Sequence, residues 1–318
     1  MALLILIGLA AGSASALLAA GVAAGALLAV PLFYLSPLPV MIAGIAFSPL
    51  AAAIAVATGG AGLWVAFGGT FLITYLVALG GPALGLSYAA MLARPDPAGR
   101  DGLVWFPVGG LVLLAAGFAA VSVAVALFAM AQDYDAYRSA VTVAFQTLVE
   151  SQGLPAGAGG RDPGAMGILI AAVLPPMAAT ITMVSQLVSL YLAARAARVS
   201  GRLARPWPSL SAFRLPPVTS LVLAVVLALS MAGGLFGLAA SAAAATLAGA
   251  YALAGFAVVH AVTLGHPARL LLLGALWVTS AALGWPVLAM AVLGFADGMF
   301  DFRSRMPTSK GPPAANDR

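Results

Sequence analysis

Long apolar stretches dominate the chain, and charged residues occur only in short groups between them. No Asp, Glu, Lys, Arg or His precedes Arg94. Four further stretches contain no Asp, Glu, Lys or Arg, namely 102–132, 163–194, 215–268 and 270–296. A transmembrane helix needs about 20 apolar residues, or more where it tilts. The pattern therefore predicts an all-α, polytopic transmembrane helical bundle with about eight to ten membrane segments, including short or broken helices.

Prolines and glycines in the apolar sequence before Arg94 indicate where its helices end. We expect crossings near 2–29, 38–58 and 61–80, with the proline-rich segment 31–39 as a break after the first crossing. The remaining piece, Pro82 to Ala93, is too short to span, because it covers about 18 Å of a hydrocarbon core of about 30 Å. It is therefore a half-helix, a re-entrant segment or an extension of the preceding crossing.

Basic residues gather at two places and indicate which helix ends face the cytoplasm. The loop 195–215 contains five arginines, and four more basic residues follow Phe302. Arginine and lysine beside membrane spans are enriched on the cytoplasmic side. We therefore expect a bacterial cytoplasmic (inner) membrane protein with a cytoplasmic basic loop and a cytoplasmic C-terminus. A single transmembrane domain over 1–302 is then followed by a disordered cytoplasmic tail, 303–318.

On this topology the segment 132–165 is an external loop between crossings at 102–132 and 163–194. Apolar residues recur at helical spacing inside the loop, and a preceding aspartate can cap the helix that they predict. The apolar positions are Val141, Phe145 and Leu148, and the candidate caps are Asp133 and Asp135. We expect this helix to lie along the bilayer surface.

The last apolar stretches present a conflict over the side on which the chain ends. The stretch 215–268 predicts two crossings divided near 233–240, which return the chain to the cytoplasm. A single final crossing would then leave the basic tail outside. The break at Gly284 resolves the conflict if two short helices, 270–284 and 286–300, form a hairpin within the membrane or at its outer face.

Glycines four positions apart predict surfaces on which helices approach closely. Gly8 and Gly12 form one such pair, and Gly294 and Gly298 form another beside an acidic residue. Internal packing is favoured over dimerisation as the use of these surfaces.

Composition limits the chemistry that this chain can perform. It is 63% apolar and 7% charged, whereas a soluble domain has about 25% charged residues, so a water-soluble globule is excluded. The absence of cysteine excludes disulfides, thiolate nucleophiles and iron–sulfur clusters. His260 and His266 are too few for a His-rich metal site, and the only lysine, Lys310, lies in a Pro/Gly-rich tail rather than a phosphate-binding loop. We therefore expect no enzyme, no cofactor and no metal.

The net charge of +5 does not indicate nucleic-acid binding, because the basic residues occupy membrane flanks rather than a broad surface. Four arginines spaced three, four and three residues apart predict one face of an extended helix end. They are Arg195, Arg198, Arg202 and Arg205. We expect them to contact anionic lipids at the cytoplasmic face of the bilayer or to bind a membrane or cytoplasmic protein partner.

Three residues are candidates for a ligand site: Tyr34, Ser36 and Asp297. Asp297 lies in an apolar segment, where an acid is costly and often functional; the alternative is an interfacial acid paired with Arg303 or Arg269. Tyr34 and Ser36 lie in the proline-rich segment. At membrane depth these two residues can contact a small ligand, whereas outside the membrane the segment is a plain loop with an interfacial aromatic.

Two stretches resemble a known family. The proline-rich turn followed by MIAGIAFSPLAAA at 41–53, and the ending GFADGMFDFRSR at 294–305, are together similar to the YybS-like family of bacterial polytopic membrane proteins. The first stretch also resembles, more weakly, the substrate-binding S components of energy-coupling-factor transporters, which are driven by separate ATPases. This second resemblance implies a ligand site that faces outside and a helix face for a partner subunit.

Two functions are therefore open. The leading hypothesis is a multi-pass inner-membrane protein that binds or transports a small molecule without its own ATPase, as an S component does. The alternative is a non-transporting membrane scaffold of an envelope or cell-shape assembly, in which the basic loop and tail contact partners.

Overall fold

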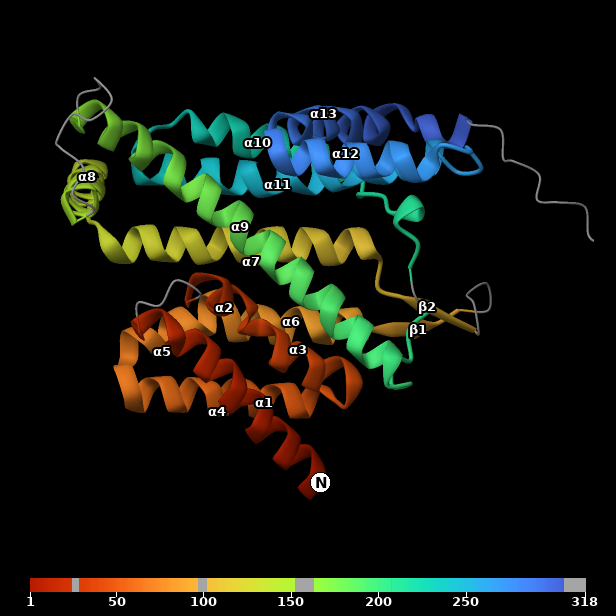
Figure 1. Ribbon diagram of the computed structural model, residues 1–318, viewed down its shortest axis with the longest axis horizontal. Coiled ribbons are helices and arrows are strands. Elements are labelled where there is room, and N and C mark those ends of the chain that lie inside the picture. The colour runs from red at the N-terminus through yellow and green to blue at the C-terminus, as the bar shows by residue number, and fades with distance from the viewer. Residues whose placement is uncertain (25–28, 97–101, 152–162, 207, 306–318) are drawn as a thin grey trace, which may run out of the picture. The chain divides into compact units, whose positions relative to one another are not determined.

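The computed structural model describes residues 1–24, 29–96, 102–151, 163–206 and 208–305 (Figure 1). Over these residues the protein is all-α apart from one short antiparallel pair of strands, which confirms the predicted fold class. By length and composition, seven helical segments of the described chain can cross a membrane, and three shorter apolar helices accompany them. The protein is therefore a multi-pass membrane protein, and the predicted eight to ten segments included short helices of this kind.

The described chain divides into two compact units. Unit 1 comprises Met1–Trp207 and Leu223–Leu247, and unit 2 comprises Pro208–Val222 and Ala248–Arg318, so that α10 (Val218–Ser230) and α11 (Gly234–Val262) contribute to both. The other helices of unit 1 are α1 (Ala2–Ala20), α2 (Ala29–Leu35), α3 (Pro37–Ala46), α4 (Pro49–Phe67), α5 (Gly69–Tyr75), α6 (Gly81–Ala90), α7 (Val108–Met130), α8 (Tyr134–Ser151) and α9 (Pro163–Val199). Strands β1 (Ala93–Pro95) and β2 (Leu103–Trp105) pair between α6 and α7.

Small residues let α1 and α4 pack closely in unit 1. A Cβ atom added to Gly12 would lie 2.4 Å from the carbonyl oxygen of Ala55, and one added to Gly8 would lie 2.9 Å from that of Ala51. These separations leave no room for a side chain on the facing side of α1. The prediction of internal packing at this glycine pair is confirmed.

The proline-rich segment is helical, so the predicted break over 31–39 is too long. Pro31 is the third residue of α2, and Pro37 and Pro39 occupy the first turn of α3. Proline is tolerated there because the first N–H groups of a helix have no intrahelical partner. The interruption is reduced to Ser36, which separates the two helices.

The predicted boundary between the second and third crossings, near residue 60, is also wrong. Gly59 and Gly60 lie inside α4. The helix begins instead after Ser48, whose side chain accepts hydrogen bonds from the N–H groups of Leu50 (3.0 Å) and Ala51 (3.4 Å). It ends at Gly68, which has φ of 86°, a conformation that few other residues adopt readily.

The short apolar piece after residue 81 extends the preceding helix. Helix α5, the π-helical turn Leu76–Gly80 and α6 follow one another without a break and together form one candidate span, Gly69–Ala90. Of the three possibilities left open by the sequence, the structure therefore shows the extension.

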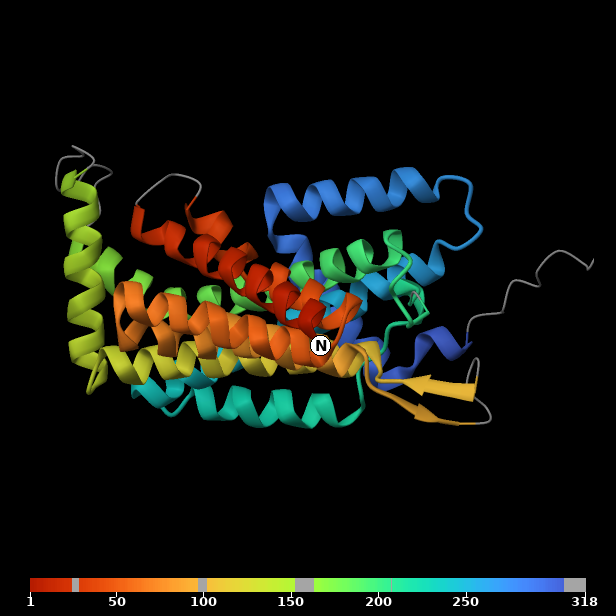
Figure 2. The ribbon, with the colours of Figure 1, turned by 90° about the horizontal axis from the view of Figure 1, so that it is seen from below.

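Helix α8 runs across the direction of α7: Figure 1 views α8 end-on and Figure 2 shows it lengthwise. Asp133 caps this helix, since its Oδ1 accepts a hydrogen bond from the Ala136 N–H (2.8 Å). Buried Tyr137 fixes α8 to α9 by donating from its hydroxyl to the Ala171 carbonyl (3.1 Å). The predicted loop helix and its cap are confirmed, and residues 152–162 of the loop lie outside the described residues.

The first crossing predicted within 215–268 is short. Helix α10 has 13 residues and covers about 20 Å, less than a bilayer core. The chain turns at Gly233 (φ 72°), at the edge of the predicted division, and α11 then supplies a full-length span.

Unit 2 contains α12 (Arg269–Leu283) and α13 (Trp285–Phe300), which are divided at Gly284 (φ 72°). The predicted pair of short helices is therefore confirmed. Backbones of α11 and α13 approach closely, because a Cβ on Gly255 would lie 1.9 Å from the Met290 carbonyl oxygen, and one on Gly294 would lie 2.0 Å from that of Tyr251. The ordered chain continues through a 3₁₀ turn, Phe302–Arg305, into the first residues of the segment predicted as a disordered tail.

Candidate functional site

The interior of unit 1 contains polar side chains at the break between α2 and α3. Ser36 is buried there, and its main-chain carbonyl accepts a hydrogen bond from the Ser15 hydroxyl of α1 (2.7 Å). The Ser15 hydroxyl also lies 2.9 Å from the Tyr75 hydroxyl at the end of α5. All three side chains are at most 1% exposed. Helices α1 and α5 therefore hold Ser36 in place through uncharged polar contacts.

Helix α9 contacts the end of α2 just before this break. The Ser185 hydroxyl donates a hydrogen bond to the Tyr34 carbonyl, and α9 packs against α3 along this part of the unit (Figure 1). Gln186 directly follows Ser185, and Ser189 lies one turn further along. Both are on the buried stripe of α9 and are at most 1% exposed.

Four polar atoms, one on Ser36 and three on the buried face of α9, have no hydrogen-bond partner among the described residues. They are Ser36 Oγ, Gln186 Nε2, Gln186 Oε1 and Ser189 Oγ. We call Ser36, Gln186 and Ser189 the buried polar cluster, because the hydrogen bond from Ser185 to Tyr34 joins the two chain segments that carry them. An unsatisfied buried polar group costs about 1–3 kcal/mol, and water is scarce at membrane depth. The cluster is therefore a group of donors and acceptors suited to a polar ligand.

Of the three predicted ligand residues, the structure joins Tyr34 to α9 and buries Ser36 two residues further along the chain. Tyr34 contributes its carbonyl to Ser185, and Ser36 belongs to the buried polar cluster. Sequence reasoning missed Gln186 and Ser189. A signal was present, because Gln186 is the only glutamine in the stretch 163–194 and Ser189 follows it at i+3, on the same helix face.

Asp297, the third predicted residue, is buried in unit 2 and forms an ion pair. Its Oδ2 lies 2.7 Å from Arg303 Nη2 and accepts a hydrogen bond from Arg303 Nε (2.8 Å), while its Oδ1 accepts one from the Arg303 main-chain N–H (3.3 Å). The two side chains are 3% and 6% exposed. This is the pairing that the sequence left as an alternative to a ligand role, and it occupies both oxygens of the carboxylate.

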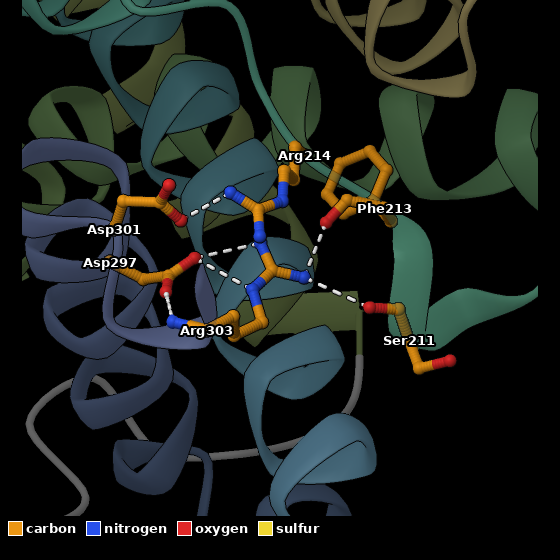
Figure 3. A network of polar contacts seen from close by, with 6 residues as sticks. All are labelled: Ser211, Phe213, Arg214, Asp297, Asp301 and Arg303. Carbon is orange, nitrogen blue, oxygen red and sulfur yellow. Dashed lines mark hydrogen bonds and ion pairs between the residues drawn. The ribbon is translucent and has the colours of Figure 1, made fainter. Parts of the chain in front are cut away.

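Figure 3 shows how this pair extends to the loop before α10. Arg303 Nη1 donates to the carbonyls of Ser211 (3.1 Å) and Phe213 (2.8 Å). Next to it, Arg214 pairs with Asp301, which adopts a left-handed conformation (φ 46°) at the end of α13. We call these six residues the C-terminal ion-pair network. It fastens the end of α13 to the loop, and its groups are satisfied by one another.

The four arginines predicted to line one helix face do not do so. Helix α9 ends at Val199, and Gly201 (φ 70°) turns the chain away before the last two of them. The guanidinium of Arg202 lies 4.4 Å from the centre of the Phe47 ring, as in a cation–π contact. Arg195 and Arg198, which lie within α9, are exposed.

Arg205 forms hydrogen bonds within unit 1. Its Nη1 donates to the Ala90 carbonyl (3.0 Å) and its Nη2 donates to the Phe106 carbonyl (2.7 Å). Burial lowers the pKa of this guanidinium from its usual value. Arg205 therefore joins the loop after α9 to the ends of α6 and β2, which leaves less of its charge for a lipid or protein partner.

Among the described residues, no group of three or more His, Cys, Asp or Glu side chains is placed to hold a metal ion. The site of unit 1 thus consists of neutral donors and acceptors in a polytopic membrane protein. A comparison with protein-family models, curated proteins and solved structures finds no match to this chain. The resemblance to the YybS-like family stays a prediction.

Proposed function

We propose that this multi-pass membrane protein binds a small polar molecule at the buried polar cluster and carries it across the membrane without an ATPase of its own. The observation that supports the proposal is Gln186, which is 1% exposed and has neither amide atom hydrogen-bonded within the described chain. A side chain in this state is costly to fold unless a partner is supplied. The proposal includes no catalytic step, cofactor or metal.

Placement within the unit also favours binding. Ser36 is the one-residue turn between α2 and α3, which together form one candidate span, Ala29–Ala46, and discontinuous helices recur at the binding sites of membrane transporters. Its surroundings are already fixed, since the carbonyls of Tyr34 and Ser36 are occupied by Ser185 and Ser15. The proposed site is thus held in position before any ligand arrives.

The proposal further places the protein in a bacterial cytoplasmic membrane with the C-terminus in the cytoplasm. The supporting feature is the basic sequence around α9 and after α13. A reporter fused after Arg318 should be active only in the cytoplasm, and activity on the external side would refute this orientation.

A scaffold role is the second candidate. It is favoured by Arg195 and Arg198, which are exposed near the end of α9, where a protein partner or anionic lipids can reach them. On this alternative, a stoichiometric protein partner is recovered with the wild-type protein and the buried polar cluster has no ligand.

Mass spectrometry of co-purified small molecules tests the proposal. The wild type and two variants, Gln186→Leu and Gln146→Leu, are purified in lipid nanodiscs and extracted. Gln146 lies exposed on α8, so the second variant makes the same chemical change away from the site. We expect a small molecule that is present in the wild type and in Gln146→Leu and is reduced at least about tenfold in Gln186→Leu, which corresponds to about 1.4 kcal/mol of binding free energy.

Identical small-molecule contents in all three proteins would refute the binding proposal. Recovery of a protein partner with no small molecule would instead favour the scaffold. Ser189→Ala provides a milder change at the same place and keeps the test informative if Gln186→Leu alters folding.

A further inference from the structure

The surroundings of the buried polar cluster contain no formal charge. The stretches that supply α1 to α6, α7 and the membrane part of α9 are 1–93, 102–132 and 163–194, and none of them contains Asp, Glu, Lys, Arg or His. A charged ligand at the cluster would therefore have no counter-ion. Burying an unpaired charge at membrane depth is costly, so the site disfavours both anions and cations.

The N-terminus of α3 does not compensate for this lack of charge. Helix N-termini attract anions because their first N–H groups are free and carry the positive end of the dipole. In α3 two of the first three residues are Pro37 and Pro39, which have no N–H to offer. The N-terminus of α3 therefore has fewer free N–H groups with which to bind an anion than an ordinary helix has.

The unpartnered atoms at the cluster favour a particular type of group. The Gln186 amide offers a donor at Nε2 beside an acceptor at Oε1, and the hydroxyls of Ser36 and Ser189 can each donate and accept. The neighbouring backbone acceptors at Tyr34 and Ser36 are already used. The groups that remain to bind a ligand are the Gln186 carboxamide and the hydroxyls of Ser36 and Ser189. They complement a ligand that itself carries a hydrogen-bond donor next to an acceptor.

From these features we infer that the ligand of the buried polar cluster is an uncharged molecule that presents a donor beside an acceptor, as a primary carboxamide does. This inference rests on the proposed function and specifies its substrate class. Gln186 pairs with the ligand group, and the two serines bind its remaining donor or acceptor. Ser15 acts as a positioning residue, because its hydroxyl donates to the Ser36 carbonyl, and the Tyr75 hydroxyl in turn contacts the Ser15 hydroxyl.

Three small probes with the same three-carbon chain test the inference: propionamide, its planar anionic counterpart propionate, and the cation propylammonium, each at pH 7. Thermal unfolding is measured in nanodiscs for the wild type, Gln186→Leu and Gln146→Leu at matched probe concentrations. A ligand that binds only the folded state raises the midpoint. We expect propionamide to raise the midpoint of the wild type and Gln146→Leu by about 2 °C or more and to have no effect on Gln186→Leu.

Propionate and propylammonium should leave all three midpoints unchanged. Stabilisation of the wild type, but not of Gln186→Leu, by either ion would overturn the inference of a neutral ligand, as would the absence of stabilisation by all three probes. The proposed function is tested separately by the co-purified small molecules. If a charged molecule co-purifies with the wild type and is lost in Gln186→Leu, the binding proposal stands and only the inference of a neutral ligand is refuted.

Discussion

Replacing Arg303 with methionine should destabilise unit 2 far more than the same replacement at Arg214. The change removes the partner of Asp297 while keeping an apolar stem of similar length. The Asp297 carboxylate, which is 3% exposed in the wild type, is then left without its cation. Breaking a buried pair in this way costs about 3–5 kcal/mol, because one charge stays buried without compensation.

The structure contains a matched control in the neighbouring pair. Arg214 and Asp301 are 49% and 50% exposed, and exposed pairs contribute about 0–1 kcal/mol. Arg214→Met should therefore cost about 1 kcal/mol or less. The same type of substitution should thus yield two magnitudes, one for a buried pair that also contacts two loop carbonyls and one for an exposed pair.

Reversible unfolding in mixed micelles, followed by tryptophan fluorescence, gives the free energies of unfolding to be compared. Arg303→Met should lower the free energy by about 3–5 kcal/mol. Combining it with Asp297→Leu should restore part of this loss, since an apolar pair of similar volume replaces the ion pair. A cost for Arg303→Met no larger than that for Arg214→Met would refute the reasoning. If the double variant is no more stable than Arg303→Met, the loss comes from the loop contacts rather than from the buried charge.

Three further predictions concern close backbone contacts and the loop after α9. Gly255→Ala should destabilise unit 2 by about 1–3 kcal/mol, because the added Cβ would meet the backbone of α13. Gly274→Ala is the control and should not destabilise it, since a Cβ there has nothing within 4 Å. Equal unfolding free energies for these two variants would contradict the close packing of α11 on α13. Gly12→Ala should likewise lower the thermal midpoint relative to Gly62→Ala, and a normal midpoint would exclude the tight contact of α1 with α4. Arg205→Lys should speed proteolysis of the loop after α9, because one ammonium group cannot reproduce the two guanidinium hydrogen bonds to the Ala90 and Phe106 carbonyls. A cleavage rate equal to that of the wild type would show that these two hydrogen bonds do not order the loop.

The sequence predicts much of the membrane architecture because charges and breaks limit where helices can lie. Stretches without charge locate α7 and α9, and the glycine at position 284 divides α12 from α13 as expected. The predicted helix boundaries are wrong where proline begins a helix rather than ending it, or where glycine serves close packing inside a helix. The prolines near residue 35 begin helices rather than interrupt them, and Gly59 lies inside α4 beside Tyr75, where a Cβ would be 2.6 Å from the tyrosine hydroxyl.

The candidate site is harder to predict, because its residues are ordinary in type. Gln186 is the only glutamine in the uncharged stretch 163–194, but the sequence does not show that its amide is buried without a partner. An acid in an apolar helix draws more attention, yet Asp297 is satisfied by Arg303 six residues later. Composition therefore identifies polar residues at membrane depth, whereas packing decides which of them keep free hydrogen-bonding capacity.

The buried polar cluster and the C-terminal ion-pair network differ in how much hydrogen-bonding capacity their atoms leave free. In unit 2, opposite charges are buried together, and Arg303 spends its donors on Asp297 and two carbonyls. A satisfied pair of this kind is costly to break and has no reason to open for a ligand. In unit 1, Gln186 is uncharged, buried and unpartnered within the described residues, so a ligand that satisfies its amide removes a cost already present in the folded protein. Function is therefore better sought at Gln186 than at the more conspicuous acid.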